Sequence, residues 1–166
     1  MTIKNVVVRN DGAMHFTATT GSGFPVTFDS GEGQVAPGPT EVVLAALAAC
    51  SAMDVVSILA KKRQVFERYE IHVRGDQRDA YPQVFTRIDV VHEVEGSGVS
   101  AVALRRSIEL SATKYCPVAA MLAAGDTEIH HAYRLVRGGD QPLDEMAEVI
   151  VTGPYRRPDV MRPGRE

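Results

Sequence analysis

The sequence has no tryptophan and little cysteine: its 166 residues include two cysteines, Cys50 and Cys116. Two cysteines are too few for the disulfide framework of a small secreted domain, and a chain of this length can bury a core without such staples. In a reducing compartment, a disulfide between them would be transient and chemical rather than a permanent brace. The two thiols are therefore the first candidates for function.

The chain also lacks an excess of charge of either sign. It has 18 Lys and Arg against 21 Asp and Glu, which leaves a net charge of -3, and the basic residues are scattered. Nucleic-acid-binding proteins usually carry a basic face or stripe. We therefore expect no nucleic-acid partner, and the 45% apolar, 23% charged composition is that of an ordinary soluble protein.

Secretory and membrane signals are absent from the pattern. The residues after Met1 do not form a charged segment followed by an apolar stretch and a cleavage site, so we expect a cytoplasmic protein. The longest apolar run, Val42 to Met53, is interrupted by Cys50 and Ser51. It is shorter than the roughly 20 residues that a membrane span needs, so we expect no membrane partner and interpret the run as part of a buried helix.

Metal and nucleotide motifs are missing as well. The cysteines and the five histidines follow no spacing typical of a zinc site. The glycine-rich stretch at residues 31–35 lacks the Lys-Ser/Thr pair of a phosphate-binding loop. We therefore expect neither a metal nor another cofactor.

The first third of the chain predicts a β-meander followed by a loop. Alternating or β-branched residues indicate three strands, and Asn10-Asp11-Gly12 between the first two is a strong turn signal. A segment rich in glycine and proline cannot hold a regular element and leads to the next one. The expected strands are residues 3–9, 14–20 and 24–28, and the loop is residues 30–39.

A long helix follows the loop. Pro39 suits a first helical turn, Glu41 suits the positive end of the helix dipole, and the cations at residues 61–63 suit its end. Nearly every position from Val42 to Leu59 is apolar or small. Such a helix has no wide polar face, so we expect a central helix that is covered on most sides.

The rest of the chain alternates strands and helices. Cys116 precedes Pro117, which predicts a short helix with Cys116 at its N-cap and Gly125 at its C-terminal cap. Residues 138–166 are expected to be a peripheral or mobile extension, in which only residues 145–151 have the pattern of a short element. The other expected elements are strands at 69–74, 84–94 and 127–136 and a helix at 99–112.

Three segments resemble the OsmC/Ohr family, particularly its OsmC-like branch: Ala36-Pro-Gly-Pro-Thr-Glu41, the stretch from Ala48 to Leu59 around Cys50, and Ser111-Ala-Thr-Lys-Tyr-Cys-Pro-Val118. The resemblance implies an α+β, OsmC-like fold in which antiparallel sheets wrap around two long central helices of an intertwined homodimer. It extends over most of residues 1–137, which we predict to be a single domain.

The resemblance also implies an activity, the reduction of organic hydroperoxides in oxidative stress defence. It gives the attacking role to Cys50 and the resolving role to Cys116, which would form a Cys50–Cys116 disulfide that an external dithiol reduces. Glu41 matches a glutamate that assists the attacking thiolate. The arginine that completes such sites has no clear counterpart here, and Arg9 is the nearest candidate. The apolar helix around Cys50 favours alkyl over inorganic peroxide.

Several alternatives stay open at this point. Asp54 lies four residues after Cys50 on the same helical face, and a nearby carboxylate disfavours a thiolate. Either a cation offsets Asp54, or Cys116, at a helix N-terminus, is the attacking sulfur. Glu41 is equally well explained as a residue that stabilises the first helical turn. The chain could also be a non-catalytic redox-sensing or ligand-binding dimer, or could hold two inert core cysteines.

Overall fold

The computed structural model describes residues 2–30, 34–138 and 143–151. They fall into two compact units, Met1–Ala45 and Ala46–Glu166. The long helix α1, Pro39–Lys61, begins in the first unit and continues in the second. The fold class is confirmed as mixed α+β, with antiparallel and parallel strand pairs beside helices.

The first unit contains the predicted β-meander. Its three strands are β1 (Val6–Gly12), β2 (His15–Thr20) and β3 (Pro25–Asp29), and they pair antiparallel in the order β1-β2-β3. The turn between β1 and β2 depends on Gly12 at φ 121° and Ala13 at φ 46°. The Asn10 side chain donates to the Ala13 carbonyl at 2.9 Å, which holds this turn closed.

Helix α1 confirms the predicted boundaries but not the predicted cover. Its buried residues recur every fourth position, which makes one stripe along one face: Leu47, Ser51, Val55 and Leu59. Apolar side chains outside that stripe are exposed, such as Met53 at 73%. Among the described residues, the fully buried side chains of α1 form one face, and the cover of its other sides stays a prediction. Its mean hydropathy of 2.3 over 18 residues matches a membrane span by length and composition, a test that core helices of soluble proteins also pass.

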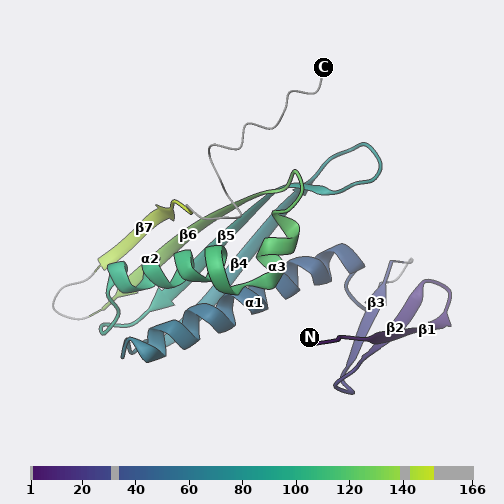
Figure 1. Cartoon of the computed structure of the whole chain (residues 1–166), viewed down its shortest axis with the longest axis horizontal. Helices are drawn as coiled ribbons and strands as arrows, with labels where there is room; N and C mark the ends of the chain where they lie inside the picture. The colour runs from purple at the N-terminus through teal and green to yellow at the C-terminus, as the bar shows by residue number, and fades with distance from the viewer. Residues whose placement is uncertain (1, 31–33, 139–142, 152–166) are drawn as a thin grey trace. The chain divides into compact units, whose positions relative to one another are not determined.

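The second unit is built on a four-stranded sheet with the order β4-β5-β6-β7 (Figure 1). The strands are β4 (Arg68–Gln77), β5 (Phe85–Glu95), β6 (Glu128–Arg137) and β7 (Leu143–Val149). Pairing is antiparallel except between β5 and β6, which run parallel. A parallel pair needs a crossover connection, and helical segments supply it here.

The crossover consists of α2 (Ala101–Leu110), the π-helix η1 (Ser111–Tyr115) and α3 (Pro117–Leu122). Side chains of α1 and α2 pack with the inward residues of β5, β6 and β7 in one apolar core. Cys116 is the N-cap of α3, as predicted. The prediction of Gly125 as its C-terminal cap is wrong, because Ala123 ends the helix in ordinary right-handed geometry and donates to the Ala119 carbonyl.

Strand β7 changes the interpretation of the C-terminal segment. The sequence assigns residues 138–166 to a peripheral or mobile extension, yet Leu143–Val149 pairs along β6 and Val149 belongs to the buried core. Within β7, Glu145 faces inward because it accepts a hydrogen bond from the Tyr133 hydroxyl. Residues 139–142 and 152–166, to which the same expectation applied, lie outside the described residues.

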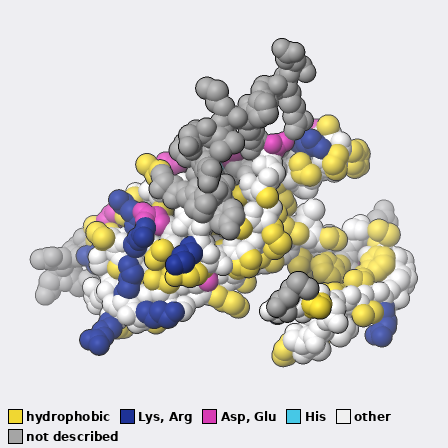
Figure 2. All heavy atoms as spheres, in the orientation of Figure 1, with side chains coloured by type: hydrophobic (Ala, Val, Ile, Leu, Met, Phe, Trp, Pro, Cys, Tyr) yellow, Lys and Arg dark blue, Asp and Glu magenta, His cyan; other side chains and the backbone are white. Residues whose placement is uncertain are grey.

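Apolar side chains also remain at the surface of the second unit. Figure 2 shows them in yellow on the visible face, and the most exposed include Val102 at 78% and Met121 at 68%. Scattered single exposed hydrophobics are normal in soluble proteins. Several exposed apolar side chains on one apolar helix are less usual, and those of α1, such as Val43 and Met53, mark this element as a candidate for further burial.

Candidate active site

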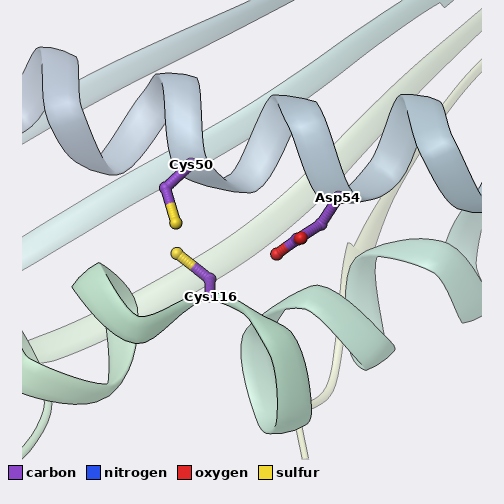
Figure 3. Close-up of side chains that lie close together, drawn as sticks. All are labelled: Cys50, Asp54 and Cys116. Carbon is purple, nitrogen blue, oxygen red and sulfur yellow. The ribbon is translucent and has the colours of Figure 1, made fainter. Parts of the chain in front are cut away.

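The two cysteines meet in the second unit. Cys50 lies on α1 and Cys116 lies between η1 and α3, and their sulfur atoms point toward one another (Figure 3). Both sulfurs and a carboxylate oxygen of Asp54 lie within 4.8 Å of one another. Folding therefore brings together the two thiols that are far apart in the sequence, as a shared chemical role requires.

The backbone around Cys116 is fixed by its neighbours. Pro117 occupies the first position of α3, and Cys116 itself is extended at φ -75° and ψ 103°. The Cys116 amide closes the π-turn by donating to the Ser111 carbonyl at 2.9 Å. The Cys116 sulfur accepts the Ala119 N–H at 3.3 Å. These bonds hold the sulfur at one position facing α1.

Burial decides the acidity of Cys116. Its side chain is 3% exposed, and this burial, together with the neighbouring Cys50, raises the pKa of the Cys116 thiol to about 11. The Ala119 amide and the Ser51 hydroxyl oppose the rise and do not cancel it. Position at a helix N-terminus therefore does not make Cys116 an acidic thiol. This direction disfavours Cys116 as the attacking sulfur, and the division of roles between the two cysteines stays a prediction.

Asp54 is the charged group of the site. It lies on the same face of α1 as Cys50, as the spacing of four residues predicts, and the Ser111 hydroxyl donates to its Oδ2 at 3.0 Å. Sequence reasoning did not identify Ser111 as a site residue, although it begins the Ser111–Val118 segment that carries the family resemblance. Ser111, at 1% exposure, follows α2 directly and continues its buried face, which contains Ser107 and Ile108.

The other two predicted participants lie in the first unit. Glu41 sits in the first turn of α1, where its Oε2 accepts the Gly38 N–H at 2.7 Å. This contact is the helix-stabilising role that the sequence offered as an equal alternative. Arg9 is exposed on β1. A role for either residue in thiol chemistry stays a prediction.

One small pocket lies beside the site. Its volume is about 20 Å³, room for roughly one water molecule. Neither cysteine is among the lining residues, which are Ala112, Thr113, Ala119, Ala123, Ile129, His131 and Val151. The apolar pocket expected around Cys50 for an alkyl substrate therefore stays a prediction.

A second polar cluster, which the sequence did not predict, lies between β4, β5 and β6. The Tyr69 hydroxyl and His92 Nδ1 are 2.6 Å apart, and the rings of His92 and His131 stack with centroids 6.1 Å apart. Burial, and secondarily His131, lowers the pKa of His92 to about 3. We call Tyr69, His92 and His131 the histidine cluster. His130, which precedes His131 in the chain, faces the other side of β6 and is partly exposed.

Comparison with known proteins identifies the family. A family model described as OsmC-like protein matches residues 31–132, which include both cysteines. The chain belongs to this family. Protein YhfA of Escherichia coli K12 is 40% identical over 121 residues, which cover 73% of this chain and 90% of YhfA. The name of that relative states no activity.

Solved structures place the chain on the same fold. An OsmC-like protein from Mycoplasma pneumoniae has a TM-score of 0.71 at 17% identity, covering 81% of this chain and 97% of that one. The organic hydroperoxide resistance protein OhrB of Bacillus subtilis has a TM-score of 0.58 at 15% identity, covering 80% and 98%. At these identities the likeness establishes the fold alone.

Proposed function

We propose that this OsmC family member is a thiol-dependent peroxidase that reduces organic hydroperoxides, alkyl or lipid-like, in oxidative stress defence. The observation that carries the proposal is the approach of the two sulfurs, which lie within 4.8 Å of each other on different elements. The likeness in fold to a protein named for organic hydroperoxide resistance supports it further.

The proposed reaction has three balanced steps. The Cys50 thiolate attacks the O–O bond of the hydroperoxide, forms a sulfenic acid after taking up a proton, and releases the alcohol. The Cys116 thiol then condenses with the Cys50 sulfenic acid, which releases water and forms a disulfide. An external dithiol reduces that disulfide by exchange and becomes a disulfide itself. The chain needs no cofactor for these steps.

The environments of the two thiols support this division of roles. Cys50 is partly exposed, which favours access of a peroxide to this residue, whereas Cys116 is buried. The raised pKa of Cys116 keeps it protonated near neutral pH. A protonated, sheltered thiol is a poor first nucleophile but can be reached by the sulfenic acid that forms beside it.

A homodimer is the second part of the proposal. Helix α1 fully buries a single stripe of four residues, and most of its other positions are apolar or small, several of them exposed, such as Val43 and Met53. A second copy of the chain packed on α1 would remove this surface from water, at about 25 cal/mol per Å² of apolar area. Sedimentation equilibrium tests this part: Met53→Glu, at the exposed face of α1, should weaken self-association, whereas a chain that is monomeric at every concentration would refute it.

Steady-state turnover tests the activity. Reduced protein should consume cumene hydroperoxide with dihydrolipoate or dithiothreitol as the dithiol, and hydrogen peroxide should react more slowly if an apolar surface at the dimer interface binds the substrate. Equal rates with both oxidants would remove the argument for an apolar substrate. Cys50→Ala should abolish consumption.

Asp54 favours a second candidate, a non-catalytic redox-sensing dimer. Its carboxylate beside the sulfurs disfavours the extra negative charge of a thiolate, which would slow peroxide attack. This function predicts reversible formation of the disulfide over minutes with few turnovers. Rapid reduction of one peroxide per chain, without sustained peroxide consumption, would favour this second function.

A further inference from the structure

We infer that Cys50, Asp54 and Cys116 form a binding site for a zinc ion in the reduced protein. Their ligand atoms, two sulfurs and a carboxylate oxygen, lie within 4.8 Å of one another. Sulfur and carboxylate ligands in a set of three, with a fourth position for water, suit Zn²⁺. The inference goes beyond the proposed peroxidase and does not depend on it.

The spacing of the three atoms fits a tetrahedral ion. Zn–S bonds of about 2.3 Å at tetrahedral angles put two sulfurs about 3.8 Å apart. The observed upper limit of 4.8 Å needs only small side-chain rotations to reach that separation. Cys50 and Asp54 share one face of α1 at a spacing of four residues, the same spacing by which helices elsewhere present two metal ligands.

Contacts behind the ligands hold them in place. The Ser111 hydroxyl donates to Asp54 at 3.0 Å, and the Ala119 amide donates to the Cys116 sulfur at 3.3 Å. Hydrogen bonds of this kind orient metal ligands and tune their affinity. Two of the three ligands therefore already have the supporting bonds that a metal site uses.

The negative charge of Asp54 next to the two sulfurs is compatible with cation binding. A carboxylate beside two sulfurs opposes the formation of a thiolate, which hinders peroxide attack. A divalent cation would reverse this effect, because it attracts the carboxylate and both thiolates and so offsets the repulsion among the three anionic groups. Asp54 thus suits cation binding better than it suits thiol activation.

Zinc binding and the disulfide exclude each other. A disulfide sulfur carries no negative charge and is not a ligand of the thiolate type that Zn²⁺ prefers. Zinc would therefore occupy the reduced state only, and it would shield both sulfurs from alkylation or oxidation. Zinc occupancy would therefore depend on whether the two cysteines are reduced or joined in a disulfide.

Metal titration under anaerobic conditions tests the site without any peroxide. Tag-free, reduced full-length protein is dialysed against Zn²⁺ and analysed for bound metal, and Co²⁺ is used as a spectroscopic probe. We expect one Zn²⁺ per chain, and with Co²⁺ an intense near-ultraviolet band from sulfur-to-cobalt charge transfer. Cys50→Ser and Cys116→Ser should each remove most of that band. Zinc should also slow alkylation of both cysteines by iodoacetamide.

The supporting residues give graded variants. Asp54→Asn should weaken affinity while keeping the sulfur-to-cobalt band, and Ser111→Ala should weaken it by about 10- to 100-fold, as loss of a supporting hydrogen bond does. Asp79→Asn, the same change at an exposed aspartate, should alter nothing. Circular dichroism checks that each variant is folded.

Two results would overturn the inference: substoichiometric zinc in the reduced protein, or metal binding that survives the double change Cys50→Ser/Cys116→Ser. Neither result bears on the peroxidase, because no oxidant is present. Conversely, peroxide turnover is measured on the reduced, zinc-free protein; its failure there, alongside stoichiometric zinc binding in the anaerobic titration, would refute the proposed function and leave the metal site standing.

Discussion

Two polar clusters within the second unit show how differently one fold can treat buried polar groups. The cysteine site joins Cys50, Cys116 and Asp54, and two of these three side chains are only partly buried. The histidine cluster is closed, with His92 at 0% and His131 at 3% exposure, and one of its rings bonds to Tyr69. The first cluster places a carboxyl group next to two sulfurs, whereas the second places a tyrosine hydroxyl and two imidazole rings together.

The difference teaches which cluster is suited to chemistry. Burial without a charged partner drives an ionisable group to its neutral form, and the low pKa of His92 is an example. A partly open site with a charge can exchange protons, bind a cation or meet a substrate. We therefore expect changes in the cysteine site to affect activity and changes in the histidine cluster to affect stability.

The largest expected effect is on peroxide consumption, and it distinguishes the role of Cys50 from that of Cys116. Cys50→Ser should lower peroxide consumption by on the order of 10⁴-fold, because it removes the only attacking atom in the proposed reaction. Cys116→Ser should still allow the first attack and accumulate a Cys50 sulfenic acid. Trapping with dimedone and mass spectrometry distinguishes the two variants. A sulfenic acid on Cys116 in the Cys50→Ser protein would reverse the roles.

The next effect concerns the pH dependence of stability. Because the folded pKa of His92 is about 3 and the unfolded value is about 6.5, the unfolded chain binds the additional proton between these pH values. The contribution of His92 is fully present above about pH 6.5 and is lost as the pH falls toward 3, a total of about 5 kcal/mol. Urea denaturation at a series of pH values measures this slope.

A matched pair of variants isolates that slope. His92→Gln removes the titrating ring and should flatten the pH dependence of the free energy of unfolding. His72→Gln makes the same change at an exposed histidine on the neighbouring strand β4 and should leave that pH dependence unchanged. An equally steep slope in His92→Gln would mean that another group causes the acid sensitivity.

The sequence predicts much of this architecture because local signals agree with it. Helix α1 begins at Pro39 and ends at Lys61, and Pro117 at the first position of α3 makes Cys116 its N-cap. The histidine cluster could not be foreseen, since it depends on the register that sets β5 beside β4 and β6. Strand β7 was predicted only in part: residues 145–151 have the pattern of a short element, but the pairing with β6 from Leu143 onward depends on the fold, as does the bond of the inward Glu145 to Tyr133.

The site was predictable in part as well. The identity of the two sulfurs follows from the sequence, and the position of Asp54 on the same face follows from helical spacing. Ser111 was not identified, although it continues the buried face of α2 seven residues after Leu104; its contact with Asp54 depends on the packing of two elements that are far apart in the sequence. The high pKa of Cys116 did not follow either, since burial by other elements outweighs the helix N-terminus.

A third prediction concerns the hydrogen bond between Tyr69 and His92 in the histidine cluster, for comparison with the hydrogen bond to Asp54 in the cysteine site. Tyr69→Phe leaves the buried His92 Nδ1 without its partner and should lower the free energy of unfolding by about 1 to 3 kcal/mol. Denaturation at pH 7 measures it, and peroxide turnover should be unchanged at temperatures where the variant is folded. A loss of turnover in the folded variant would connect the two clusters functionally.

The smallest expected effect lies in the open cluster. Ser111→Ala removes one hydrogen bond to Asp54, whose partly exposed carboxylate can bind water instead, so we expect a loss of about 1 kcal/mol or less. Thermal unfolding followed by circular dichroism measures it. A loss as large as that of Tyr69→Phe would show that the cysteine site is as closed as the histidine cluster.

Mass spectrometry of peptides after brief oxidation tests the central claim most directly. Reduced protein is treated with one equivalent of cumene hydroperoxide, digested without reductant and compared with the untreated sample. We predict that the intact chain loses two hydrogens and that one peptide joins Cys50 to Cys116. A chain that gains oxygen on a single cysteine, or stays unmodified while both thiols remain free, would contradict the account.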